Sequence, residues 1–143
     1  MSDGGGFERV AVVGAGTMGN GIAQTFATHG TEVVLIDVVE PALKKGLATI
    51  EKSLGKFAEK GKLTPADAKA TLARVKPSTT LQDARAAELV VEAVVEKADV
   101  KRKVFAELDA LTPGPTILAT NTSSISITEI GAATKRADRV IGM

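Results

Sequence analysis

Three glycines with a defined spacing follow a short apolar run near the start of the chain. Gly14, Gly16 and Gly19 complete the pattern G-x-G-x-x-G directly after Val10–Val13, and a run of small residues follows them. The first glycine permits a tight turn, the second lets the backbone approach a pyrophosphate, and the third lets a helix pack closely on a strand. A glycine-rich surface turn is the alternative, but the strand before and the helix after favour a dinucleotide site.

A carboxylate then stands where a dinucleotide site would need one. Asp37 lies 18 residues after Gly19, at the end of the second apolar run, Glu32–Ile36. A carboxylate can accept both ribose hydroxyls of NAD but repels the additional phosphate of NADP. Val38 and Val39 supply no arginine to bind that phosphate. The sequence therefore predicts NAD as the cofactor, with a helix-capping aspartate as the alternative interpretation.

Polar residues also follow two later apolar runs. Glu96 and Lys101 come after Leu89–Val91, and they could bracket a ribose and its phosphate, although a solvated helix start explains them almost as well. The short polar side chains of residues 121–124 follow Ile117–Ala119, where a nicotinamide or a substrate oxygen would lie. A polar turn leading to a helix cap at Ser126 is the alternative there.

The order of the apolar runs predicts the fold that would bring these residues together. Short runs alternate with helix-like segments, which is typical of an α/β protein with a Rossmann-type, doubly wound, mainly parallel sheet. The sequence also predicts a helical hairpin insertion at about 41–74, in which Thr64 caps the second helix and Pro65 fills its first position. Ser126 and Glu129 have the spacing of a capping box. We expect a flexible leader at 1–8 and one domain over 9–143.

The composition excludes several classes of function. The 143 residues carry a formal net charge of +1, which provides no general field for nucleic acid or a membrane surface. There is no cysteine, so disulfides and thiolate metal sites are excluded, and no metal site is predicted. No apolar run is long enough for a membrane span, and the first residues do not resemble a signal peptide, so we expect a cytoplasmic protein.

Three segments, in this order and spacing, resemble one family of enzymes. GAGTMG, VVEAVVEK and ATNTSSISITEI are similar to the NAD-binding domain of the 3-hydroxyacyl-CoA dehydrogenases, including bacterial 3-hydroxybutyryl-CoA enzymes. GAGTMG alone also resembles 3-hydroxyisobutyrate and 6-phosphogluconate enzymes. The resemblance implies that Ser123 hydrogen-bonds the reacting oxygen of the substrate. It implies cofactor contacts at Gly14, Gly16, Thr17, Met18, Gly19, Asp37, Ala93, Glu96, Lys101 and Asn121.

The resemblance further implies that the helical hairpin contacts the coenzyme A nucleotide of an acyl-CoA substrate, at Ser53 and Lys60. Independently of any family, Glu51 to Lys62 holds four lysines against two glutamates, with Lys60, Gly61 and Lys62 at the expected tip. A flexible cationic tip suits a phosphate, while a soluble hairpin turn is the alternative.

The predicted chemistry needs a general base, and these residues offer few. Oxidation of an alcohol by hydride transfer requires removal of the hydroxyl proton. The single histidine, His29, lies ten residues beyond Gly19, about 15 Å along a helix, and a helix-end role before Gly30 fits it better. Resembling sequences continue into a segment with a catalytic histidine, its glutamate partner and a helical domain that makes a homodimer. We therefore expect a cofactor half with little or no turnover by itself.

Two alternatives remain open at this level. A 3-hydroxyisobutyrate-type dehydrogenase with a lysine base would share the glycine turn, but it should not need a coenzyme A contact at Lys60. A non-catalytic NAD-binding module is the other. The favoured interpretation is hydride transfer between C3 of a 3-hydroxyacyl-CoA, such as 3-hydroxybutyryl-CoA in fatty-acid metabolism, and NAD.

Overall fold

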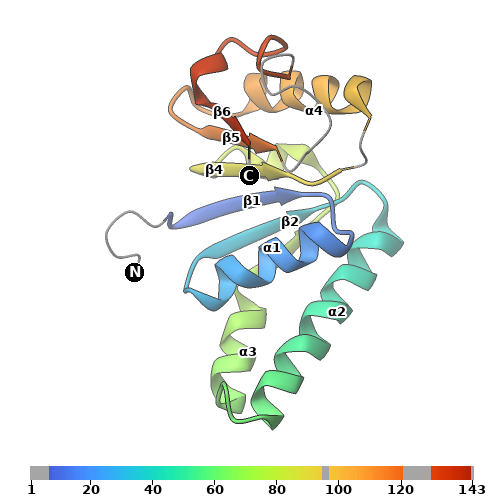
Figure 1. The fold of residues 1–143 in the computed structure, drawn as a ribbon, viewed down its shortest axis with the longest axis vertical. Coiled ribbons are helices and arrows are strands. Elements are labelled where there is room, and N and C mark those ends of the chain that lie inside the picture. Colours follow the sequence, from blue (N-terminus) through green and yellow to red (C-terminus); the bar gives the residue numbers. More distant parts are fainter. Residues whose placement is uncertain (1–6, 95–96, 121–129, 143) are drawn as a thin grey trace.

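The computed structural model describes residues 7–94, 97–120 and 130–142. Within them lies a six-stranded sheet in the order β3-β2-β1-β4-β5-β6, in which every neighbouring pair is parallel (Figure 1). The strands are β1 Arg9–Val13, β2 Glu32–Ile36, β3 Val75–Ser78, β4 Leu89–Glu92, β5 Ile117–Thr120 and β6 Val140–Gly142.

Helices cover both faces of this sheet. The helices are α1 Thr17–Thr28, α2 Glu40–Glu59, α3 Pro65–Ala73 and α4 Ala98–Leu111, with short 3-10 turns at Leu81–Ala84 and Ala137–Arg139. In Figure 1, α1, α2 and α3 lie below the sheet and α4 lies above it. This arrangement confirms the predicted Rossmann-type, doubly wound α/β fold with a helical hairpin, and the sheet is parallel throughout its described pairs.

The central strand β1 shows why its residues are almost uniformly apolar. Successive side chains of a strand point to opposite faces of the sheet. Val10 and Val12 belong to the core under α1 and α2, while Ala11 and Val13 belong to the core under α4. A strand covered on both faces must be apolar at every position, so it reads as a continuous run.

The strand β3 was not among the apolar runs identified in the sequence. Its residues are Val75, Lys76, Pro77 and Ser78, of which only Val75 is buried. The strand lies at one edge of the sheet and pairs only with β2, so it needs few apolar residues and tolerates a proline. Such an edge strand lacks the run of apolar residues by which a buried strand is recognised in a sequence.

The folded part begins earlier than the predicted leader would allow. Phe7 packs against the apolar core, and its carbonyl accepts a hydrogen bond of 3.1 Å from the Thr31 hydroxyl. The backbone N–H of Glu8 donates to the Glu88 carboxylate. Phe7 and Glu8 therefore belong to the domain rather than to a leader; residues 1–6 lie outside the described residues. No described helix has the length and apolarity that crossing a membrane requires.

The helical hairpin forms as the sequence predicts. Helices α2 and α3 pack side by side and project away from the sheet (Figure 1). The Thr64 hydroxyl accepts a hydrogen bond of 3.0 Å from the backbone N–H of Asp67, and Pro65 occupies the first helical position. Gly61 has φ of 75° in the connecting turn, a conformation that glycine adopts without steric cost.

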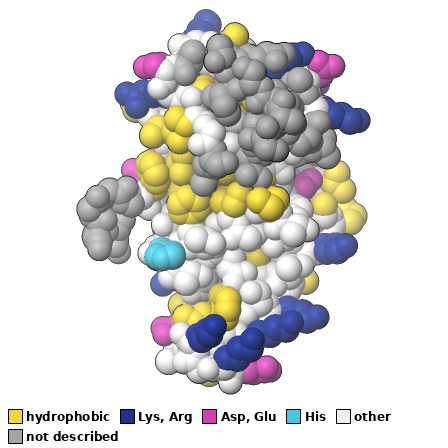
Figure 2. Space-filling view, viewed as in Figure 1, with side chains coloured by type: hydrophobic (Ala, Val, Ile, Leu, Met, Phe, Trp, Pro, Cys, Tyr) yellow, Lys and Arg dark blue, Asp and Glu magenta, His cyan; other side chains and the backbone are white. Residues whose placement is uncertain are grey.

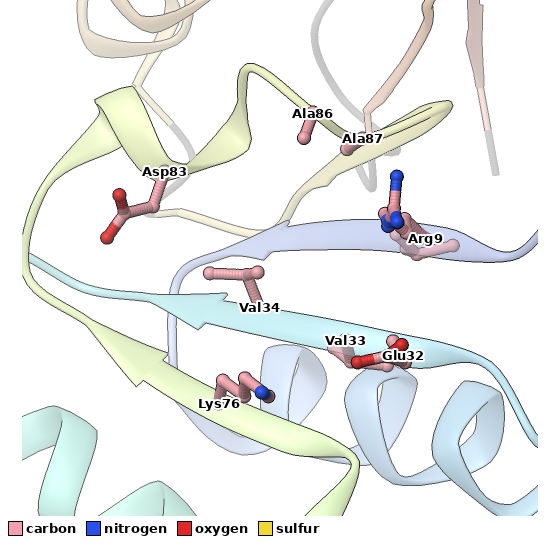
Figure 3. A pocket seen from close by; sticks show the side chains of 9 residues that line it. Arg9, Glu32, Val33, Val34, Lys76, Asp83, Ala86 and Ala87 are labelled. Carbon is pink, nitrogen blue, oxygen red and sulfur yellow. The ribbon is translucent and has the colours of Figure 1, made fainter.

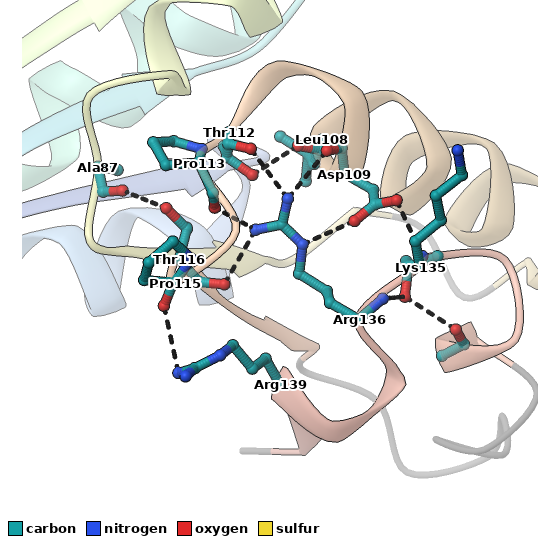
Figure 4. A network of polar contacts seen from close by, with 12 residues as sticks. Ala87, Leu108, Asp109, Thr112, Pro113, Pro115, Thr116, Lys135, Arg136 and Arg139 are labelled. Atoms are coloured by element: carbon teal, nitrogen blue, oxygen red, sulfur yellow. Dashed lines mark hydrogen bonds and ion pairs between the residues drawn. The ribbon is translucent and has the colours of Figure 1, made fainter.

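Arg136 connects the C-terminal end of α4 with the segment that leads into β5. The Arg136 guanidinium donates from Nε to the Asp109 carboxylate over 2.6 Å, and its two terminal nitrogens donate to four backbone carbonyls (Figure 4). Those carbonyls belong to Asp109, Thr112, Pro113 and Thr116. Because the last carbonyls of a helix lack partners within the helix, Arg136 closes the end of α4 and ties it to the segment that leads into β5.

The strand order determines where a ligand can bind. From β1 the chain moves outward to β2 and β3, then returns to the opposite side of β1 with β4. The connections after β1 and β4 therefore leave the sheet in different directions and leave a crevice between them. In open α/β sheets this position, at the carboxyl ends of the strands, is where ligands bind.

Candidate dinucleotide-binding site

The glycine turn lies at that crevice, and its first glycine is required by both conformation and space. Gly14 has φ of 107°, and its N–H donates to the Ile36 carbonyl over 2.7 Å. A Cβ on this residue would lie 2.7 Å from the Ala93 carbonyl oxygen. The turn after β1 is thus held against the ends of β2 and β4, the two strands that flank β1.

The other two glycines have opposite surroundings. A Cβ on Gly19 would lie 1.6 Å from the Gly14 carbonyl oxygen, so α1 can approach the turn only where no side chain is present. A Cβ on Gly16 would meet nothing within 4 Å. The structure therefore assigns Gly19 to internal packing, whereas Gly16 leaves open space on the side from which a phosphate would approach.

The start of α1 is well suited to an anion. Gly16 is its N-cap residue and has no side chain to satisfy the first N–H groups, and the first turn holds no acidic residue. Thr17 and Met18 are exposed there, Met18 to 58%. The unpaired N–H groups of a helix start, together with the positive end of the helix dipole, favour a bound phosphate.

We expect Gly16→Ala to separate binding from folding. The variant should unfold at nearly the same temperature as the wild type because its methyl group enters open space. Its affinity for NADH should fall about tenfold, since the methyl group stands between the backbone and a pyrophosphate. Titration followed by nicotinamide fluorescence, beside thermal unfolding, checks both parts. An alanine variant that binds NADH as tightly as the wild type would show that the phosphates lie elsewhere.

Asp37 joins the glycine turn to the second strand. Its Oδ2 accepts a hydrogen bond of 3.0 Å from the Ala15 N–H, and its Oδ1 accepts one of 2.9 Å from the Val39 N–H. The helix-capping alternative does not hold, because the N-cap of α2 is Val39. A carboxylate has about four acceptor positions, so two bonds to backbone leave capacity for ribose hydroxyls.

A pocket of about 520 Å³ opens between the glycine turn and α4. Its walls are almost entirely apolar, and Asp37 is the charged residue among them. Val38 and Val39 are exposed to 74% and 54% beside it, and such exposed apolar side chains suit the faces of a planar ring. The lining residues are Val13, Gly14, Gly16, Ile36, Asp37, Val38, Val39, Ala42, Leu81, Ala93, Val94, Val100 and Val104.

Lys101 lies in a different environment from the one its sequence context indicates. Its side chain is fully buried and its ammonium donates to the Glu92 carboxylate over 2.6 Å. The alternative of a solvated helix start is therefore wrong for Lys101. Glu92, also fully buried, was not identified from the sequence, where it appears as the last residue of an apolar strand.

A second residue that sequence reasoning missed is Gly46, in the middle of α2. It is buried, and a Cβ there would lie 2.6 Å from the Ala15 carbonyl oxygen. The helix α2 thus rests directly on the glycine turn. The only signal available in the sequence is a glycine inside a long helical segment, which often has a packing reason.

The remaining predicted residues divide into two groups. Ser53 lies on α2, where its hydroxyl accepts a hydrogen bond of 2.9 Å from the Gln24 side chain, and Lys60 is exposed at the C-cap of α2. The predicted residues Glu96, Asn121 and Ser123 lie outside the described residues, as does the capping box at Ser126 and Glu129.

A smaller pocket, of about 150 Å³, lies elsewhere on the sheet (Figure 3). Arg9 and Glu32 on its rim are the first residues of β1 and β2. It therefore lies at the amino ends of these strands, the opposite end from the glycine turn. Because open α/β sheets bind ligands at the carboxyl ends, this pocket is not part of the candidate site.

The fold and the site together define a Rossmann-type dinucleotide-binding domain. The family model described as "3-hydroxyacyl-CoA dehydrogenase, NAD binding domain" matches residues 9–143. The chain belongs to this family and is a domain that binds NAD.

Individual relatives agree with this assignment. The chain is 47% identical to a 3-hydroxybutyryl-CoA dehydrogenase of Clostridioides difficile over 94% of its own length and 48% of the relative. It is 44% identical to a 3-hydroxyadipyl-CoA dehydrogenase of Escherichia coli, over 95% of the chain and 29% of that protein. The crystal structure of (S)-3-hydroxybutyryl-CoA dehydrogenase from Ralstonia eutropha superposes with a TM-score of 0.92 at 48% identity, covering 96% of this chain and 48% of that one. The chain thus spans about half the length of several relatives it matches.

Proposed function

We propose that this chain is the cofactor half of an NAD-dependent 3-hydroxyacyl-CoA dehydrogenase. In the proposed reaction a hydride passes between C3 of a 3-hydroxyacyl-CoA, with 3-hydroxybutyryl-CoA as the model substrate, and the nicotinamide of NAD. The names of the relatives that the chain matches over nearly its whole length support this substrate class. We also propose a role in fatty-acid metabolism, which relatives named as the alpha subunit of a fatty acid oxidation complex support, and a cytoplasmic location.

The observation that carries the proposal is the pairing of a free helix start with a carboxylate on one pocket. The first turn of α1 would bind the pyrophosphate, and Asp37 would accept the hydroxyls of the adenosine ribose. The apolar walls beside Val38 would then cover the adenine ring. In this arrangement the predicted contacts of Gly14, Thr17 and Met18 would all be made with the same NAD molecule.

The substrate side of the proposal rests on the family resemblance and on charge. Ser123 would hydrogen-bond the reacting oxygen and Asn121 would lie beside the nicotinamide. Ser53 and Lys60 on α2 would contact the coenzyme A nucleotide. Basic side chains gather at the far end of the hairpin in Figure 2, where Lys60 and Lys62 are both exposed, and this supports a phosphate contact there.

We propose that the general base lies outside the described residues, because the single histidine, His29, is far from the cofactor phosphates. His29 follows the last residue of α1, and its Nδ1 lies 2.8 Å from the Thr25 carbonyl oxygen. The twelve residues of α1 separate it by about 18 Å from the phosphate end of that helix. We propose that proton transfer uses a histidine and a glutamate of a further helical domain, which would also form a homodimer.

Binding of reduced cofactors tests the proposal. The purified chain should bind NADH saturably and NADPH at least about tenfold more weakly, because the Asp37 carboxylate repels the additional phosphate. The double variant Asp37→Ser, Val38→Arg should lose this preference or reverse it, and Val38→Ala is the matched control that keeps the carboxylate. Equal binding of both cofactors by the wild type would remove Asp37 as the discriminating residue.

A further inference from the structure

Three elements that border the second half of the crevice meet at one buried carboxylate. Glu92 is the last residue of β4, and its side chain is fully buried. Its Oε2 accepts from the Lys101 ammonium and from the Val94 N–H, each over 2.6 Å. Its Oε1 accepts from the Thr120 hydroxyl, also over 2.6 Å. The carboxylate thus joins the end of β4, the first turns of α4 and the end of β5.

The register of the sheet explains why Glu92 can make all of these contacts. Glu92 is paired with Val13 of β1 on one side and with Thr120 of β5 on the other. It follows Val90 on the same face of the sheet, the face that α4 covers. One side chain therefore lies between the strand that leads into the glycine turn and the strand that leads into residues 121–124.

Stability alone does not explain a buried ion pair at this position. Removing two charges from water carries a large penalty, and apolar residues of similar volume often serve stability as well or better. The contacts of Glu92 instead fix positions. Thr120 ends β5, and Lys101 lies in the first turn of α4, which leads from β4 to β5. Both strands lie on the opposite side of β1 from β2, which Asp37 follows, so these two contacts fix the side of the crevice away from Asp37.

We propose that Glu92 is a positioning residue for the nicotinamide half of the cofactor site, acting through its contacts with Lys101 and Thr120. The inference rests on the proposed function only in that the cofactor lies across the crevice with its nicotinamide beyond β4. The adenosine half is positioned by Asp37 and α1, which Glu92 does not contact among the described residues. A change at Glu92 should therefore affect the two halves of the cofactor unequally.

Comparison of NADH with ADP-ribose, which lacks the nicotinamide, tests this inequality in the purified chain. Glu92→Gln removes the charge opposite Lys101 but keeps an oxygen that can accept from the Val94 N–H. It should therefore raise the Kd for NADH about tenfold and leave the Kd for ADP-ribose within about twofold of the wild type. The fluorescence enhancement of bound NADH should fall as well, because the nicotinamide is no longer held. Asp109→Asn is the matched control: it alters another ion-paired carboxylate, near the opposite end of α4, and should change neither Kd.

A milder pair of variants guards against loss of folding. Thr120→Val removes one donor to Glu92 while the ion pair with Lys101 remains, and it should weaken NADH about threefold with ADP-ribose unchanged. Thr120→Ser keeps the hydroxyl and should restore wild-type binding. Equal loss of both ligands, in parallel with a lower unfolding temperature, would make Glu92 merely structural and overturn the inference. If the wild-type chain bound ADP-ribose as tightly as NADH, the nicotinamide would contribute nothing to binding. That result would also overturn the inference, although the NAD site itself would stand.

Discussion

Gly19→Ala is expected to destabilise the domain by about 3 kcal/mol and to weaken NADH binding about 100-fold. The added methyl group would lie 1.6 Å from the Gly14 carbonyl oxygen, a backbone atom that cannot rotate away. The helix α1 would have to withdraw from β1, and its free N–H groups would move with it. Thermal unfolding and NADH titration measure the two effects.

Gly21→Ala provides the control within the same helix. A Cβ on Gly21 meets nothing within 4 Å, and alanine is favoured over glycine in a helix by about 1 kcal/mol. This variant should be as stable as the wild type or more so, with unchanged NADH affinity. If the two alanine variants behaved alike, the close packing of α1 on the glycine turn would not be what Gly19 provides.

Arg136→Met is expected to cost about 3 to 5 kcal/mol of unfolding free energy. The substitution keeps an unbranched side chain but leaves the Asp109 carboxylate without its cation. It also removes the donors to the four carbonyls at the end of α4 and before β5. With Arg136 and Asp109 exposed to only 9% and 13%, water cannot fully replace these bonds. Urea unfolding monitored by circular dichroism gives the difference.

The neighbouring Arg139→Met is the control for that change. Arg139 is exposed, and its guanidinium donates one long hydrogen bond, of 3.4 Å, to the Pro115 carbonyl (Figure 4). This variant should change stability little. Comparable losses for the two arginine variants would contradict the assigned role of Arg136.

The pH dependence of stability should reveal the same ion pair. Burial raises the pKa of Asp109. Hydrogen bonds from the Lys135 N–H and from Arg136, together with the positive charges of both residues, lower it by more, so the pKa lies below its ordinary value of 3.8. A carboxyl group whose pKa is depressed by folding stabilises the folded state above its unfolded pKa, and this contribution disappears as the pH falls through the folded value. At neutral pH the Asp109→Asn variant should therefore have a lower free energy of unfolding than the wild type. As the pH falls below about 3.8, the variant should lose less of its remaining stability than the wild type does, and urea unfolding across this pH range measures both.

Features encoded over short distances in the sequence could be predicted. The glycine turn, the strand before it and the Thr64 cap each depend on a few consecutive residues, and their positions agree with the structure. The place of Asp37 beside the glycine turn could also be predicted, because its separation from Gly19 follows from one helix and one strand. The fold class followed from the alternation of these elements.

Features that depend on contacts across the fold could not. Nothing near Glu92 indicates that Lys101 and Thr120, nine and 28 residues later, will share its carboxylate. For Lys101 the sequence predicted a cofactor contact and left a solvated helix start as the alternative, because charged residues at a helix start are usually exposed; its burial against Glu92 was not predicted. Gly46 requires the distance to Ala15, which only the packed structure supplies.

The contact between Gly46 and the glycine turn means that the length of α2 sets the distance from that turn to the tip of the hairpin. Gly46, in the first half of this helix, lies against Ala15, and about 20 Å of helix separates it from Glu59 at the C-terminal end. The distance between the two phosphate contacts proposed for this domain is thus set by a count of residues. Inserting one helical turn between Gly46 and Ser53 would move Lys60 about 5 Å further from the glycine turn, so the two phosphate contacts would fit a longer ligand.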